Sequence, residues 1–157
     1  MSNLQSIITK TKFELKKQET QMNLQLNELK SYIESILDRK NQNYEINENE
    51  FASKINSHLE KMKKTLSGLN SELKNEKNSK QINEKILDAI YPISSMITSI
   101  KNASSSLILA QNQCALNGDL KNADKLAKIS LELNYENHMF VKKASEEIKV
   151  LKQNLDM

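Results

Sequence analysis

The apolar residues of this chain recur at alternating intervals of four and three positions, and this spacing leaves few folds open to it. The clearest example lies between residues 89 and 118 and joins Met96, Ile100, Ala103, Leu107, Ala110 and Cys114. Residues at this spacing share one face of an α-helix. The same stretch carries a single charge, Lys101, whereas the sequence on either side is rich in charge. We therefore predict that residues 89–118 form the central, most buried helix of a helical assembly.

The composition supports an all-α fold. The 157 residues include only two glycines and one proline, so the chain lacks the residues that a many-stranded β fold needs at its turns. Aromatic residues make up 4% and charged residues 27% of the chain, a balance that is typical of long helices with solvated outer faces. The length predicts a single domain over residues 1–157.

Interruptions in the apolar spacing divide the chain into four long predicted helices. An asparagine-rich segment, residues 40–47, separates the first two, and Asn47 is a suitable N-cap for the second. A wholly polar segment, residues 74–81, separates the second from the third, in which Pro92 predicts a kink. The predicted helices span residues 3–40, 48–74, 80–116 and 119–155.

The strongest local signal is the tripeptide Asn117-Gly118-Asp119. Glycine is favoured in the left-handed position that ends a helix, and aspartate caps the helix that follows. So short a connection predicts that the third and fourth helices form an antiparallel αα-hairpin.

Residues 107–134 around this turn resemble a single tetratricopeptide repeat, with Gly118 at the turn and Ala123 in the second helix. The resemblance departs from that pattern at Ala110 and at Tyr135, where proline is usual, and it does not recur along the chain. Such arrays need roughly three repeats for stability. We therefore interpret the segment as a tight helical hairpin outside any repeat family.

These patterns leave two architectures open. The four helices form either an up-down antiparallel bundle or an elongated antiparallel coiled coil made of two hairpins. The apolar stripes at residues 4–36 and 51–73 are as narrow as a coiled-coil contact line. Narrow stripes leave surface for a partner helix, and the residues that we predict to contact a partner are Leu15, Met22, Leu29, Leu59, Met62 and Leu66.

The sequence contains no pattern that predicts catalysis, a cofactor or a metal. His58 and His138 are isolated from each other and from other metal-ligating residues at metal-site spacing, and Cys114 lies on an apolar helix face. The 23 basic and 20 acidic residues are interspersed, giving a net charge of +3, which does not favour nucleic-acid binding. We expect a protein that is not an enzyme, with no cofactor.

Abundant apolar stripes without catalytic chemistry predict a non-enzymatic helical protein–protein binding module, such as a small adaptor, a chaperone-like partner or a subunit of a larger assembly. The expected partner is another protein, and a second copy of the chain, forming a homodimer, is one candidate. The alternative is a membrane-active or secreted helical protein that uses the helix at residues 89–118. The N-terminal segment lacks the apolar core of a signal peptide, so a cytoplasmic protein is expected, with signal-less secretion left open.

Overall fold

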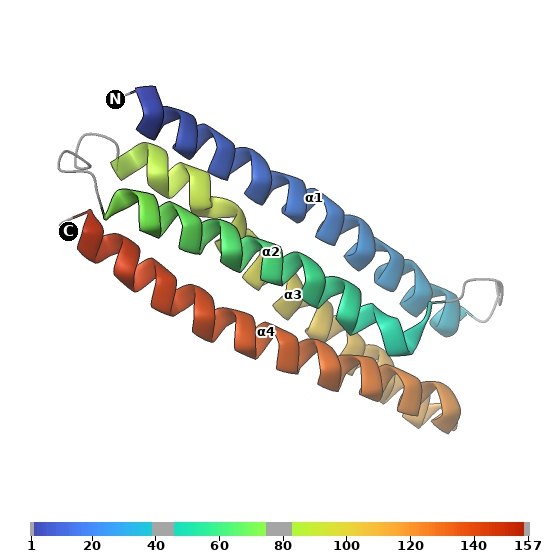
Figure 1. Cartoon of the computed structure of the whole chain (residues 1–157). Helices are drawn as coiled ribbons and strands as arrows, with labels where there is room; N and C mark the ends of the chain where they lie inside the picture. Colours follow the sequence, from blue (N-terminus) through green and yellow to red (C-terminus); the bar gives the residue numbers. More distant parts are fainter. Residues whose placement is uncertain (1, 39–45, 75–82, 156–157) are drawn as a thin grey trace.

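The computed structural model describes residues 2–38, 46–74 and 83–155, and these residues form an all-α fold. The helices are α1 (Ser2–Asp38), α2 (Glu48–Leu73), α3 (Asn83–Leu116) and α4 (Leu120–Asn154) (Figure 1). Each helix begins and ends within three residues of its predicted limits. The predicted connections at residues 40–47 and 74–81 fall mostly on residues 39–45 and 75–82, which lie outside the described residues.

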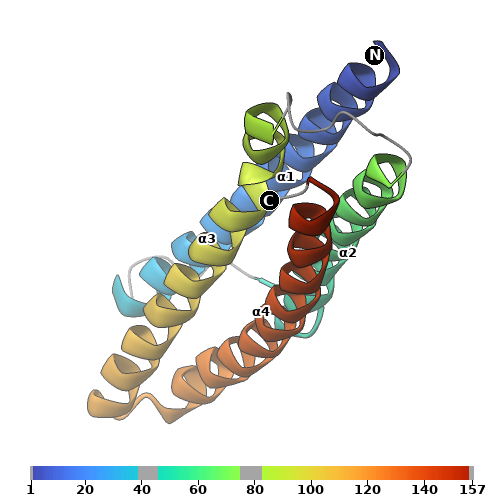
Figure 2. The same ribbon diagram turned by 90° about the vertical axis from the view of Figure 1, so that its left-hand side faces the viewer.

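The four helices pack as a bundle in which successive helices run in opposite directions (Figures 1 and 2). The neighbouring pairs are α1–α2, α2–α4, α4–α3 and α3–α1. The bundle therefore consists of two antiparallel hairpins, α1–α2 and α3–α4, placed side by side so that helices running in the same direction touch. The consecutive helices α2 and α3 lie across a diagonal of the bundle.

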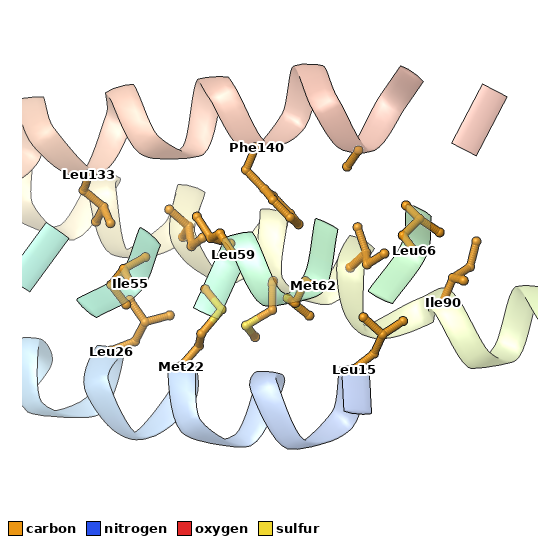
Figure 3. Close-up of a cluster of buried hydrophobic side chains, with 14 of the residues drawn as sticks. Leu15, Met22, Leu26, Ile55, Leu59, Met62, Leu66, Ile90, Leu133 and Phe140 are labelled. Atoms are coloured by element: carbon orange, nitrogen blue, oxygen red, sulfur yellow. The ribbon is translucent and has the colours of Figure 1, made fainter. Parts of the chain in front are cut away.

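A single apolar core runs along the bundle axis and receives side chains from all four helices (Figure 3). Met22 of α1, Leu59 of α2, Ile100 of α3 and Leu133 of α4 are each fully excluded from solvent. Phe140 of α4 is the largest of the fully buried side chains. Because removal of apolar surface from water is the main favourable term in folding, this shared core is what holds the four helices together.

Residues 89–118 do not form a central helix, and that prediction is wrong. Residues 89–116 belong to α3, which packs between α1 and α4 as one of four peripheral members, and Asn117 and Gly118 form the turn that follows it. One side of α3 is buried, as Ile100 and Leu107 show, but Leu109 and Leu116 on the other side are 70% and 87% exposed. A four-helix bundle has no central position, so every helix keeps one face in solvent. The helix continues through Pro92, and the kink expected there stays a prediction.

A polar contact joins each of the four neighbouring helix pairs. Asn70 of α2, which is 3% exposed, donates from Nδ2 to the main-chain oxygen of Glu147 at 2.8 Å and to its carboxylate at 2.7 Å. Burying a polar group without a partner is costly, so the buried contacts among these favour one axial position of a helix over its neighbours; the Lys12–Asp88 ion pair is exposed. The contacts are Gln18–His58 for α1–α2, Lys12–Asp88 for α1–α3, Asn70–Glu147 for α2–α4 and Ser104–Asn134 for α3–α4.

The predicted hairpin between α3 and α4 is present. Gly118 has a φ of 79°, and its N–H donates to the carbonyl of Ala115, while the N–H of Asp119 donates to the carbonyl of Cys114 at 2.8 Å. This pair of bonds is a Schellman motif, which satisfies the last carbonyls of a helix. The carboxylate of Asp119 then accepts from the N–H of Asn122 at the start of α4.

The two glycines predict stability changes of opposite sign. At Gly68 of α2 an added Cβ would meet no atom within 4 Å, so Gly68→Ala should raise the free energy of unfolding by about 0.5–1 kcal/mol. At Gly118 the positive φ disfavours any Cβ, so Gly118→Ala should lower it by about 1–2 kcal/mol. Urea denaturation of both variants measures the two changes. Shifts of the same sign would contradict the turn geometry.

Candidate functional site

The six residues predicted to contact a partner lie inside the bundle. Each of the six is 0% or 1% exposed, and together they form the wall of the core that α1 and α2 share (Figure 3 labels all but one of them). A side chain that is covered by its own chain has no surface to offer in this conformation. The narrow apolar stripes on α1 and α2 are therefore covered by other helices of the same chain. A docking surface can lie only on the outer faces of the helices. The six are Leu15, Met22, Leu29, Leu59, Met62 and Leu66.

His58 holds a polar network between α1 and α2. Its Nδ1 lies 2.6 Å from Oε1 of the buried Gln18, and its Nε2 lies 3.3 Å from Nε2 of Gln25. Because the Gln18 oxygen can only accept, Nδ1 carries the proton and Nε2 accepts from the Gln25 amide. Burial lowers the pKa of His58, and the neighbouring charge of Lys61 lowers it further.

This network predicts a pH dependence of stability. Since the pKa of His58 in the folded chain lies below its value in the unfolded chain, its contribution to stability is present above pH ~6.5 and is lost as the pH falls through the folded pKa. The free energy of unfolding, followed by urea denaturation, should fall between neutral and mildly acidic pH. His58→Gln, which cannot titrate, should show a shallower fall. An unchanged slope in this variant would assign the effect to other groups.

An open hollow of about 360 Å³ lies on the surface between the first part of α2 and the middle of α4. Its walls carry exposed Leu131 and Tyr135 beside Glu132 and Glu136. Burial raises the pKa of Glu136, Lys63 opposes this rise, and Glu60 and Glu132 add to it. The hollow brings together residues 49–56 and 131–136, which no sequence pattern had connected.

The outer face of α3 carries an uncharged stripe, which we call the outer α3 stripe. Its members follow one another at intervals of four and three positions, so they lie in one line along the helix. All of them are exposed, and the line points away from the core residues Ile100 and Leu107. Its apolar members, Leu87, Tyr91, Leu109 and Leu116, are between 43% and 87% exposed. The stripe consists of Leu87, Tyr91, Ser94, Thr98, Asn102, Ser105, Leu109, Asn112 and Leu116.

The outer face of α4 has the opposite character. Over a comparable length it presents both signs of charge to solvent, at Asp124, Lys128, Lys142, Glu146 and Lys149. Charged outer faces are the usual condition of helices in soluble bundles. Exposed apolar side chains also occur singly on α1, at Phe13 and Leu24, and single exposures need no explanation. A line of exposed, uncharged positions along the helix is what distinguishes α3, and the exposed charges Asp88 and Lys101 lie beside that line.

The sequence contained a signal for this stripe. The near absence of charge in residues 89–118 led us to predict the most buried helix of the assembly, whereas about half of its uncharged positions face solvent. The apolar members of the stripe stand in two groups, Leu87 with Tyr91 and Leu109 with Leu116. Small polar residues separate the two groups, so the apolar residues by themselves do not form a continuous line at helical spacing.

Comparison with known proteins gives this chain no relative: no family model, curated protein or solved structure matches it. Among the described residues, no cluster of three or more histidine, cysteine, aspartate or glutamate side chains could hold a metal ion. Within the same residues, none of the helices is apolar over a length sufficient to traverse a bilayer.

Proposed function

We propose that this protein is a non-enzymatic helical binding module and that it docks a protein partner on the outer α3 stripe. The observation that carries the proposal is the exposure of four large apolar side chains along a line of uncharged positions. Interface cores are depleted of charge and enriched in large apolar and aromatic residues. An adaptor, a chaperone-like partner or an assembly subunit acting in the cytoplasm would use such a face.

The alternative is that α3 lies on a membrane surface. Helices that bind membranes in this way usually carry lysine or arginine beside the apolar face and an aromatic residue at the interface. Tyr91 supplies an exposed aromatic residue on the stripe, but Lys101 is the only charge of residues 89–118. The scarcity of basic residues beside the stripe favours a protein partner over anionic lipid.

Site-specific photo-crosslinking in source cells tests the proposal. A photoreactive residue at Thr98, in the middle of the stripe, should yield one discrete adduct, and the same residue at Lys64, exposed on α2, should not. The double variant Leu109→Lys/Leu116→Lys should abolish the Thr98 adduct, whereas Leu24→Lys on α1 should preserve it. Both leucines of the double variant are at least 70% exposed, so it should fold normally, as circular dichroism can verify.

Two results would overturn the proposal. One is equal labelling from positions 98 and 64, which would mean that α3 has no special role. The other is flotation of the protein with phosphatidylcholine–phosphatidylserine vesicles that is lost in the double variant, which would assign the stripe to a membrane surface.

A further inference from the structure

We infer that the partner at the outer α3 stripe is a second copy of this chain, packed with its α3 antiparallel to the first about a two-fold axis beside residues 101 and 102. The inference rests on the proposed function and specifies its partner. Two identical surfaces related by a two-fold axis must be complementary to themselves. The outer α3 stripe meets this condition.

The stripe is close to palindromic in the positions of its members. In an antiparallel pair, two residues oppose each other when their numbers are equally far from the axis. This rule places Leu87 opposite Leu116, and Ser94 opposite Leu109. Leu87 and Leu116 therefore form an apolar contact at each end of the pair, and Thr98 faces Ser105 near the middle, where Lys101 faces Asn102.

Side-chain volume favours the antiparallel direction over the parallel one. Antiparallel pairing sets the large Leu109 against the small Ser94, and Tyr91 against Asn112. Parallel pairing would set Leu109 against Leu109 and Tyr91 against Tyr91, and these bulky pairs would hold the middle of the two helices apart. Facing large and small side chains interdigitate better than equal ones, and antiparallel helix dipoles also attract each other.

The length of the stripe limits the surface area that the two copies can bury. From Leu87 to Leu116 the helix is ~43 Å long, and a contact about 10 Å wide would bury roughly 900 Å² over the two copies. Interfaces of this size belong to weak and transient complexes. The two copies of Lys101 approach each other near the axis and repel. We therefore expect a reversible dimer with a Kd of about 10–100 µM.

Sedimentation equilibrium tests the association. The wild-type chain should fit a monomer–dimer equilibrium, and Leu109→Lys/Leu116→Lys should weaken it by at least about tenfold. Leu24→Lys, on the exposed face of α1, should leave it unchanged. A wild-type monomer at concentrations about tenfold above the expected Kd would overturn the inference. A dimer that persists in the double variant would overturn it as well, because the contact would then lie elsewhere.

Disulfide trapping tests the direction, in a Cys114→Ala background that removes the native thiol. Asn102→Cys, beside the axis, should form a disulfide-linked dimer under mild oxidation. Leu116→Cys should not do so alone, but it should form one when mixed with Leu87→Cys. Strong self-linkage of Leu116→Cys would indicate the parallel arrangement and overturn the inference.

The experiments distinguish failure of the proposed protein-binding function from failure of the inference that the partner is a second copy. A monomeric wild-type chain whose Thr98 adduct contains a different protein, and is lost in the double variant, would refute the second copy and leave the proposed function standing. The absence of both the dimer and the adduct would refute both.

Discussion

Phe140→Ala should lower the free energy of unfolding by about 3–5 kcal/mol, the usual cost of removing a buried phenylalanine side chain. Phe140 is 1% exposed and points from α4 toward the side chains of the other helices in the bundle core (Figure 3). Rigid helices on all sides would prevent collapse around the space it leaves, so both lost apolar burial and a residual cavity contribute. Urea denaturation followed by circular dichroism measures the change.

Tyr135→Ala is the matched control on the same helix. Tyr135 is 62% exposed, so its loss should change the free energy of unfolding by no more than about 0.5 kcal/mol. A comparable loss in the two variants would contradict the orientation of α4. A small loss in both would mean that the core is loosely packed around Phe140.

Leu107→Ala should lower the free energy of unfolding by about 2–5 kcal/mol. Leu107 is 0% exposed on the inner face of α3, in line with the buried Ile100 and Ala110. Ser105, two residues away, lies on the outer α3 stripe, and its hydroxyl donates to the carbonyl of Lys101 at 3.1 Å. Ser105→Ala should therefore change the free energy of unfolding by no more than about 0.5 kcal/mol.

Thermal melts of these two variants separate the inner and outer faces of α3. A large shift for Leu107→Ala beside a small one for Ser105→Ala is the expected result. Equal, small shifts would contradict the packing of α3 against α1 and α4. If Leu107→Ala spared the melt and instead weakened binding to vesicles, the membrane alternative would gain over a protein-binding surface.

Local sequence signals were sufficient for the helices themselves. Asn47 was predicted to cap α2, and its side chain accepts from the N–H of Asn49. Gly118 and Asp119 were predicted to end α3 and start α4, and both do so. Caps and turns involve residues close in sequence, so the chemistry of a few neighbouring side chains decides them.

The candidate surface was harder to predict because helical spacing reports an apolar line without saying what covers it. Leu15 and Leu59 were assigned to a partner, but other helices of the same chain bury them. Leu109 and Leu116 belong to the charge-poor stretch that was predicted to form the most buried helix, yet they are 70% and 87% exposed. Absence of charge alone does not show that a helix face is covered by protein.

The sequence by itself determined that the chain is all-α, the limits of its helices to within about three residues, and which line of each helix is apolar. The lateral order of the helices was decided only by the tertiary structure, in which α1 packs beside α3 and α2 packs beside α4. The physical reason is that apolar burial is non-directional and rewards any neighbour equally. Selection among neighbours comes from contacts such as Asn70 with Glu147, which lie 77 positions apart and cannot be recognised from either residue alone.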